Sequence, residues 1–269
     1  MKYQEIKPTG ILAHYVKCFW TLERTYHQDE KEIVWPDGNV ELLFHYGSRY
    51  YNKNRQMPHS FVIGPLTKYM DLISDGHVSL MGVRFQPWGF ASFFRETMKE
   101  LTNQMVPLET LIGYEAKLLE EMIYGANKEE ALSILEKFLV KRLTGIQNEI
   151  MIPMVSKLKS KKGNIHIKSM AEEFYISERQ MERFFRQHIG VSPKKLSTIL
   201  RFDAARTCMI FAPHMSMQEI MYKFGYYDYS HFTKDFRNYL GMSPKEYHTW
   251  IKQIKRDGKD VAFLQESEE

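Results

Sequence analysis

Apolar residues follow two different periods along the chain, and the change comes near Pro87. Before that point, apolar runs such as VELLFHY (40–46) and VSLMGVRF (78–85) are separated by turn residues, which is typical of β-strands. The Asp-Gly pair in WPDGN (35–39) favours a tight turn between antiparallel strands. The chain is therefore expected to be β-rich to about residue 86, as an antiparallel β barrel or sandwich of cupin-like form that begins near Ile11.

After Pro87 the apolar residues fall at helical spacing. Segments 88–96, 108–124 and 129–143 share this pattern, which predicts flanking helices over 88–143. One apolar face of the last segment is formed by Leu132, Leu135, Leu139 and Leu143. That face can close the barrel or pair with a second copy of the chain, and packing in the core is the favoured interpretation.

The carboxy-terminal third contains an internal repeat. Residues 171–196 align with residues 221–247 when one extra residue is allowed in the second turn. Phe185-Arg186 then matches Phe236-Arg237, and GVSP (190–193) matches GMSP (241–244). A repeated unit of two helices across a short turn fits a helix-turn-helix. The overall fold class is therefore α+β, with an all-α double helix-turn-helix part at the carboxy terminus.

Local capping signals place the helices of this repeat. Ser177 and Gln180 form a capping box that predicts a helix over 178–188, and Asp228 caps a helix over 229–240. Ser216 with Glu219 starts a further helix that ends near Phe224. The connecting helix runs from Ser192 to about Phe211 and spans about 30 Å, near the roughly 34 Å between successive major grooves on one face of DNA.

The positive charge of the chain is concentrated in one region. Residues 1–145 carry a net charge of −1, residues 146–256 carry +9, and residues 257–269 carry −4. Clustered Lys and Arg suit binding to a polyanion, although a basic surface also favours solubility. Three domains or segments are expected with these boundaries, and the last is an acidic tail.

The repeat resembles a known family. The run from Ser177 to Phe185 and FGYYDYSHFTKDFRNYLGMSPKEY (224–247) are similar to the DNA-binding domain of the AraC/XylS family of bacterial transcription regulators. PDGNVELLF (36–44) and GVRFQPWGFASFF (82–94) resemble the sensor half found before this domain in uncharacterised members. The resemblance implies a sensor or dimerisation domain over 1–145 and a DNA-binding domain over 146–256. Lys234 stands where the family usually has Arg.

Two sets of residues are candidates for DNA contact. On the first recognition helix, Arg179 and Arg183 suit guanine edges, Glu182 suits cytosine, and Arg186 suits phosphate. On the second helix, the resemblance places base contacts at Tyr229, Ser230, Thr233 and Lys234, with Arg237 near phosphate. The alternative for each charged residue is a solvated helix face.

The sensor half offers weaker candidates for a small-molecule site. Aromatic walls and a few polar groups are typical of ligand pockets, and the residues that fit are Trp20, Trp35, Glu41, His45, Arg84 and Trp88. No HxH or HExxH spacing occurs, and Cys18 and Cys208 form no CxxC pair, so no metal, cofactor or catalytic residue is expected.

The leading hypothesis is a sequence-specific DNA-binding regulator whose partners are double-stranded DNA, a small-molecule effector and, as a homodimer, its own copy. It is not expected to be an enzyme. The alternative is a regulator-like module fused to an enzymatic, cupin-like or DNA-repair domain, and a third hypothesis lacks an effector. No stretch approaches the roughly 18 apolar residues of a membrane span, and MKYQEIKPTG is no secretory signal, so no membrane partner and a cytoplasmic location are expected.

Overall fold

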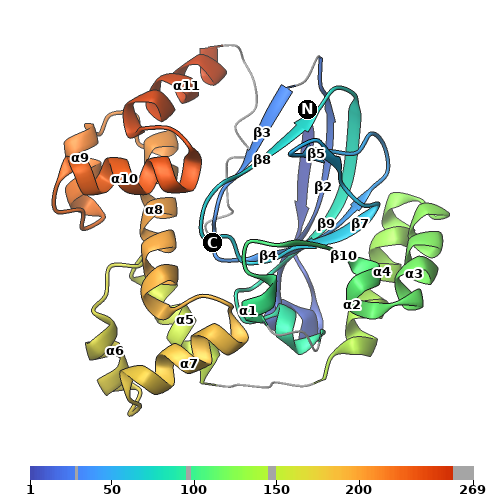
Figure 1. Cartoon of the computed structure of the whole chain (residues 1–269), viewed down its shortest axis with the longest axis horizontal. Coiled ribbons are helices and arrows are strands. Elements are labelled where there is room, and N and C mark those ends of the chain that lie inside the picture. The colour runs from blue at the N-terminus through green and yellow to red at the C-terminus, as the bar shows by residue number, and fades with distance from the viewer. Residues whose placement is uncertain (28–29, 95–97, 145–149, 257–269) are drawn as a thin grey trace.

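The computed structural model describes residues 1–27, 30–94, 98–144 and 150–256 (Figure 1). The first 144 residues, here called the amino-terminal part, are built around two antiparallel sheets. The larger sheet has the order β1 (Lys2–Ile6), β2 (Val16–Thr25), β9 (His77–Phe85), β4 (Val40–His45), β7 (Ser60–Ile63) and β10 (Met105–Pro107). The smaller sheet has the order β3 (Glu30–Val34), β8 (Met70–Ser74), β5 (Tyr51–Asn52) and β6 (Arg55–Gln56). The predicted antiparallel β architecture is confirmed. Its first strand begins at Lys2, earlier than expected, and Ile11 lies in a 3-10 turn, η1 (Gly10–His14).

The two faces of the larger sheet have different coverings. Alternate side chains of a strand point to opposite faces. On β4, Val40, Leu42 and Phe44 pack toward the helices of the amino-terminal part, while Leu43 packs toward the smaller sheet. Glu41 shares the face of Leu43, so a polar side chain is placed between the two sheets.

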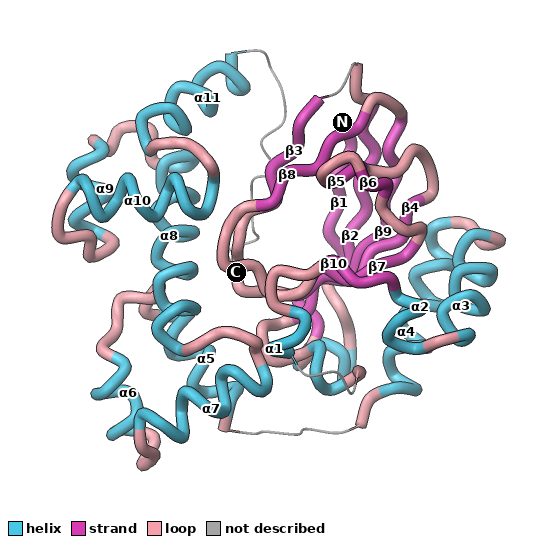
Figure 2. The backbone as a smooth tube through the Cα atoms, in the orientation of Figure 1, coloured by secondary structure: helices cyan, strands magenta, loops and turns pink. Residues whose placement is uncertain are grey.

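Helices cover the other face of the larger sheet. They are α1 (Met98–Leu101), α2 (Leu108–Ile112), α3 (Tyr114–Tyr124) and α4 (Lys128–Arg142). In α4, Leu135 and Leu139 are fully buried, and Leu132 and the C-cap residue Leu143 pack against the same core, which confirms the core interpretation of this apolar face. Figures 1 and 2 show α2, α3 and α4 on the side of the sheet away from the carboxy-terminal helices.

The expected helix over 88–96 is wrong for the described residues 88–94. Only a short 3-10 turn forms there, η2 (Phe90–Ser92). Phe90, Phe93 and Phe94 all turn into the core beside Phe85, with ring centroids 5.4–6.5 Å from the Phe85 ring. The packing of three aromatic rings against the sheet therefore overrides the local helical spacing.

The carboxy-terminal part, residues 150–256, is entirely helical in its regular elements. They are α5 (Met151–Ser160), α6 (Ile167–Glu173), α7 (Glu178–His188), α8 (Pro193–Phe211), α9 (Met217–Lys223), α10 (Tyr229–Leu240) and α11 (Pro244–Arg256). The predicted caps at Ser177, Ser216 and Asp228 are confirmed, since each side chain accepts a hydrogen bond from a backbone N–H of the first turn, and Ser192 caps α8 in the same way. The predicted acidic tail, 257–269, and residues 146–149 lie outside the described residues.

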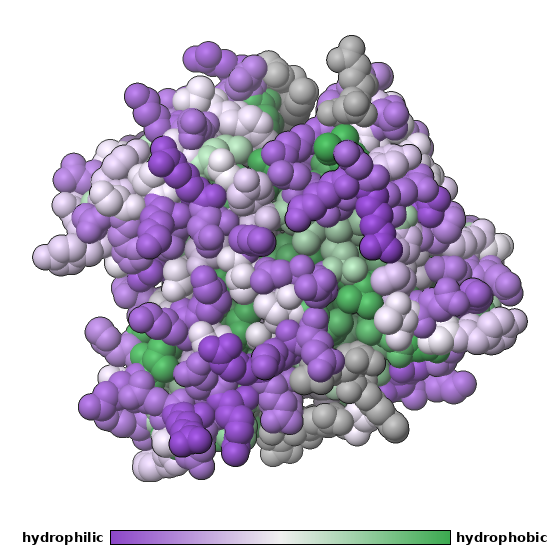
Figure 3. Space-filling model, viewed as in Figure 1, coloured by the Kyte–Doolittle hydropathy of each residue, from purple (hydrophilic) through white to green (hydrophobic). Residues whose placement is uncertain are grey.

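Polar contacts and packing hold the two parts together. Thr102 Oγ1 donates to the carbonyl of Gly190, 3.0 Å away, beside the end of α7. The backbone N–H of Tyr69 donates to the carbonyl of Asn238 on α10, at 3.3 Å, and Asn238 Nδ2 donates to the carbonyl of Thr67. Both recognition helices therefore contact the amino-terminal part near their carboxyl ends. Most of the surface in Figure 3 is hydrophilic, and apolar residues gather near the middle of this face.

Candidate DNA interface and ligand cavity

The first recognition helix, α7, separates a buried apolar side from an exposed charged side. Met181 and Phe185 are fully buried in a core shared with α5, α6 and the start of α8. The exposed side chains of α7 include all four that are predicted to contact DNA, namely Arg179, Glu182, Arg183 and Arg186. This division follows from the 3.6-residue period and leaves the charged side open.

Ion pairing divides the four α7 residues that are predicted to contact DNA into two groups. Glu182 Oε1 accepts hydrogen bonds from Arg186 Nε at 3.0 Å and Nη2 at 2.8 Å. Arg179 and Arg183 have no ion-pair partner within the described part of the chain, and the guanidinium of Arg183 lies 5.5 Å from the centre of the Phe184 ring. The guanidinium hydrogens of Arg179 and Arg183 are the ones left available for an external acceptor.

The second recognition helix, α10, exposes both uncharged polar and basic side chains. Tyr229, Ser230, Lys234 and Arg237 are exposed. Thr233 is half-buried, and its Oγ1 has no hydrogen-bond partner among the described residues. Thr233 is therefore the least accessible of the residues predicted to contact DNA.

The connecting helix α8 belongs to both helix-turn-helix cores. Leu196 packs in the first core, while Ile199, Phe202 and Met209 pack in the second. Its 19 residues extend about 28 Å. Since each core includes part of α8, this helix fixes the separation of the two units.

A cavity of about 150 Å³ lies in the amino-terminal part between the two sheets. Four of the six predicted ligand residues line it, namely Trp20, Trp35, Glu41 and Arg84. The other lining side chains include Tyr3, Arg24, Glu32, Asp37, Tyr50 and Phe61. Sequence reasoning missed Tyr3 because it placed no strand before Ile11. The apolar residues of KYQEI, Tyr3 and Ile6, are three positions apart and so lie on opposite faces of the strand, which gives no clear β alternation.

The structure places His45 and Trp88 away from the cavity. His45 lies at the end of β4, where its Nδ1 is 3.0 Å from the carbonyl of Pro58 and its ring stacks on Phe61. Trp88 Nε1 donates to the carbonyl of His14, 2.9 Å away, and the indole packs between the cores of the two parts. Neither side chain is among those that line the cavity.

His45 predicts a pH dependence of stability. Burial lowers its pKa to about 4, so below pH 6.5 the unfolded chain binds a proton that the folded chain excludes. The free energy of unfolding is therefore expected to fall as pH decreases from about 6.5 to about 4, by at most about 1.4 kcal/mol per pH unit from this residue. Urea denaturation of His45→Phe across this range should show a shallower slope than the unmodified protein, and an unchanged slope would contradict the assignment.

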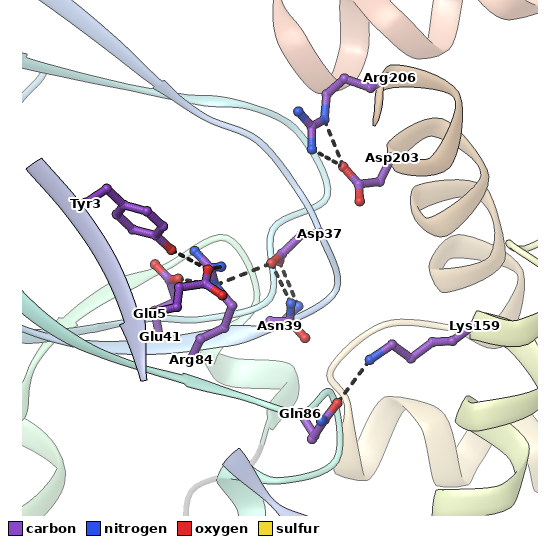
Figure 4. A network of polar contacts seen from close by, with 10 residues as sticks. All are labelled: Tyr3, Glu5, Asp37, Asn39, Glu41, Arg84, Gln86, Lys159, Asp203 and Arg206. Carbon is purple, nitrogen blue, oxygen red and sulfur yellow. Dashed lines mark hydrogen bonds and ion pairs between the residues drawn. The ribbon is translucent and has the colours of Figure 1, made fainter. Parts of the chain in front are cut away.

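One guanidinium at the cavity wall is shared by three carboxylates, as Figure 4 shows. Arg84 Nε donates to Glu41 Oε1 at 2.7 Å, and Arg84 Nη1 donates to Glu5 Oε1 at 3.3 Å. Asp37 Oδ2 lies 4.0 Å from Arg84 Nε. Register explains this grouping, because Glu41 pairs with Arg84 across β4 and β9. The neighbouring carboxylates hold the pKa of Arg84 above its ordinary value, although burial opposes this shift.

A second polar cluster lies farther along the wall. Arg24 Nη1 donates to Glu32 Oε2 at 2.6 Å, and the Tyr26 hydroxyl donates to the same oxygen at 2.9 Å. Burial raises the pKa of the Glu32 carboxyl, and the charge of Arg24 opposes this effect. The hydroxyls of Tyr26 and Tyr50 are also hydrogen-bonded, at 2.5 Å.

The turn at residues 35–39 contacts both the cavity and the connecting helix. Trp35 and Asp37 line the cavity. The guanidinium of Arg206, on α8, lies 4.4 Å from the centre of a Trp35 ring, and a Cβ on Gly38 would come within 2.6 Å of Leu196 on α8. Gly38 also has φ +84, a conformation that residues other than glycine rarely adopt. The close approach of the turn to α8 therefore requires glycine at this position for two reasons.

Comparison with known proteins separates the chain into two matched regions. Residues 4–107 match a family described as a domain of unknown function (DUF6597), and residues 170–249 match a helix-turn-helix domain family. An uncharacterized HTH-type transcriptional regulator of Haemophilus influenzae is 32% identical over 94 residues, which is 35% of this chain and 31% of the relative. The HTH-type transcriptional activator RhaS of Salmonella arizonae is 35% identical over 78 residues, or 29% of this chain and 28% of the relative. The chain thus spans about a third of the length of each relative or less.

A solved structure shares the fold over most of the chain. ToxT from Vibrio cholerae matches with a TM-score of 0.50 and 13% sequence identity, covering 86% of this chain and 98% of ToxT. That likeness shows a common arrangement of a β-rich part and a helical part. The matched regions therefore identify residues 170–249 as a helix-turn-helix domain similar to those of HTH-type transcriptional regulators, and residues 4–107 as a domain of a family of unknown function.

Proposed function

We propose that the protein is a sequence-specific DNA-binding transcription regulator, and that a small molecule in the amino-terminal cavity changes its affinity for DNA. One observation carries the proposal: two capped recognition helices, each with an open polar or charged side, are fixed to a single connecting helix. Helices in this arrangement suit two successive major grooves.

The charge and packing of the carboxy-terminal part support DNA as the partner. Residues 146–256 carry a net charge of +9, and counterion release makes such a surface favourable for phosphate binding. Arg179 and Arg183 are exposed on α7, where a guanidinium can bond O6 and N7 of guanine together. The proposed site of action is the cytoplasm, where this target lies.

The turn at residues 35–39 supports an effect of the cavity on DNA binding. A ligand that displaced Trp35 or Asp37 would disturb the contacts of this turn with Arg206 and Leu196 on α8. The helix α8 sets the separation of α7 and α10. A small shift of α8 relative to the turn at residues 35–39 therefore alters how well both helices fit DNA. A ligand shifts the equilibrium only as far as it binds the two arrangements differently.

Binding to DNA is tested by fluorescence anisotropy. The protein is titrated into labelled duplexes selected from a random pool, and into shuffled duplexes, at several salt concentrations. We expect affinity to fall steeply with salt for both duplexes, and the selected duplex to bind about 10³-fold tighter or more. Equal affinity for selected and shuffled duplexes would reject sequence-specific recognition.

The exposed guanidinium of Arg183 gives a sharper prediction. Arg183→Ala should weaken binding to the selected duplex by about 1–3 kcal/mol, roughly 5- to 150-fold, and relax the preference at one base pair. Arg55→Ala, an exposed residue on β6, serves as the control and should leave affinity unchanged. If the two variants bind alike, Arg183 belongs to a solvated helix face.

A further inference from the structure

Both recognition helices are followed by glycines that the sequence repeat aligns. Gly190 comes just after α7 and Gly241 just after α10, and both have a left-handed backbone, with φ +86 and +77. Each glycine is packed against the amino-terminal part. A Cβ on Gly190 would come within 2.7 Å of Thr102 Oγ1, and a Cβ on Gly241 within 2.8 Å of the Tyr69 ring. The carboxyl ends of both helices therefore lie directly on the amino-terminal part.

Hydrogen bonds hold each of these helix ends in place. Beside α1, which lies next to the end of α7 (Figure 1), Thr102 Oγ1 donates to the carbonyl of Gly190 at 3.0 Å. At the end of α10, the Tyr69 N–H donates to the carbonyl of Asn238 at 3.3 Å, and Asn238 Nδ2 donates to the carbonyl of Thr67 at 3.2 Å. Carbonyls in the last turn of a helix have no partner within that helix, so Tyr69 supplies a bond that α10 itself does not provide.

The two contact points belong to one unit, because Asn103 joins the loop before β8 to the turn after α1. The Thr67 N–H donates to Asn103 Oδ1 at 2.8 Å, and Asn103 Nδ2 donates to Thr67 Oγ1 at 2.9 Å. The Asn103 N–H donates to the carbonyl of Pro65 at 2.9 Å. Asn103 has φ +60, a conformation that Asn adopts more readily than most residues. Residues 64–69 and 98–104 are here called the clamp.

The clamp leaves the predicted base contacts uncovered. Arg179 and Arg183 on α7, and Tyr229 and Lys234 on α10, all precede the clamped ends and are exposed in the full chain. The arrangement that the clamp holds is therefore open to DNA. A long helix such as α8 can curve, and the clamp gives each recognition helix a second attachment at its far end. Binding in two grooves favours helices that are already in place, because freedom of movement would otherwise be lost on binding.

We infer that Thr67, Thr102 and Asn103 are positioning residues for DNA binding. Through the clamp, the amino-terminal part holds the two recognition helices in the arrangement that reaches both major grooves. This inference rests on the proposed binding to two grooves. Its consequence is that the protein discriminates between spacings of the two half-sites as well as between base sequences, because a clamped pair of helices cannot follow a change in spacing.

The clamp is tested first without DNA. Asn103→Gly keeps the left-handed conformation available and removes the side-chain bonds to Thr67. Spin labels at Glu172→Cys on α6 and Gln218→Cys on α9, two exposed positions, report the distance between the units by double electron–electron resonance in a Cys208→Ala background. We expect one narrow distance distribution in the otherwise unmodified chain and a broader distribution after Asn103→Gly. Equally narrow distributions in both would overturn the inference.

DNA binding then separates positioning from stability. The selected duplex is compared with a duplex in which one base pair is inserted between the two half-sites. We expect the unmodified chain to bind the longer duplex about tenfold more weakly or worse. In Asn103→Gly, the selected duplex should bind about tenfold more weakly and the spacing penalty should fall below about threefold. A role in stability alone would weaken binding to both duplexes equally.

A matched variant and a second clamp variant complete the test. Asn54→Gly is the control, because Asn54 is exposed in the β5–β6 hairpin and also has a left-handed backbone, with φ +62. It should change neither the distance distribution nor the spacing penalty. Thr102→Val, which loses the bond to Gly190, replaces Asn103→Gly if that variant does not fold. A folded clamp variant that keeps the full spacing penalty, or that binds the selected duplex more tightly, would overturn the inference. The distance measurement contains no DNA, so it succeeds or fails separately from the proposed regulator function.

Discussion

Replacing Arg206 with leucine is expected to lower the free energy of unfolding by about 3–5 kcal/mol. Arg206 is fully buried, and its Nε and Nη2 lie 2.8 Å and 2.7 Å from Asp203 Oδ1. Without the guanidinium, a carboxylate stays in the protein interior with its main cationic partner removed. The loss is measured by urea denaturation at neutral pH, followed by circular dichroism.

Two further variants separate the buried charge from the loss of side-chain volume. Arg206→Leu combined with Asp203→Leu removes both charges and should recover most of the lost stability, because an apolar pair needs no compensating charge. Arg55→Leu, on the exposed strand β6, should change stability by less than about 0.5 kcal/mol. A double variant that is no more stable than Arg206→Leu alone would contradict this explanation.

Arg206 also matters because of where its other contacts lie. Its guanidinium covers a Trp35 ring at 4.4 Å and donates from Nη1 to the Tyr247 hydroxyl at 3.4 Å. Trp35 belongs to the cavity wall, and Tyr247 belongs to α11 behind the second recognition helix. One side chain therefore joins the proposed effector site to the second helix-turn-helix core.

The helical part of the fold is readable from the sequence because its boundaries are set locally. Ser177 and Asp228 lie within three residues of the backbone groups that they cap, so no knowledge of the rest of the fold is needed. The predicted recognition helices, 178–188 and 229–240, have the same ends in the structure. The helix expected over 88–96 was wrong because distant packing of Phe90 and Phe93 decided that segment.

The cavity was harder to predict because strand pairing brings its residues together. Glu41 and Arg84 are 43 residues apart and meet only through the register of β4 and β9. The position of a residue along its strand matters as much as the face it occupies. His45 lies on the same face of β4 as Glu41. However, four residues of a strand span about 13 Å, so His45 lies beyond the end of the cavity.

Truncation of Phe236 is expected to unfold the second helix-turn-helix unit selectively. Phe236 is fully buried, and its ring lies 4.8–5.9 Å from the rings of Phe202, Phe232 and Tyr247. Phe236→Ala removes these contacts and leaves a cavity, at a cost of about 3–5 kcal/mol. Since α8 carries separate residues in the two cores, Phe185→Ala should cost a similar amount but act on the first unit.

Hydrogen exchange and footprinting together locate the damage. In Phe236→Ala, we expect exchange to accelerate in α9 and α10 while α6 and α7 stay protected, and the protected stretch of DNA to shrink toward one major groove. Phe185→Ala should reverse this pattern. Phe211→Ala is the matched control, because that side chain is 52% exposed at the end of α8 and its loss should have little effect. Equal acceleration of hydrogen exchange in both units after either core substitution would contradict this prediction and show that the two units unfold as one. We expect separate unfolding because α8 contributes different residues to the two cores.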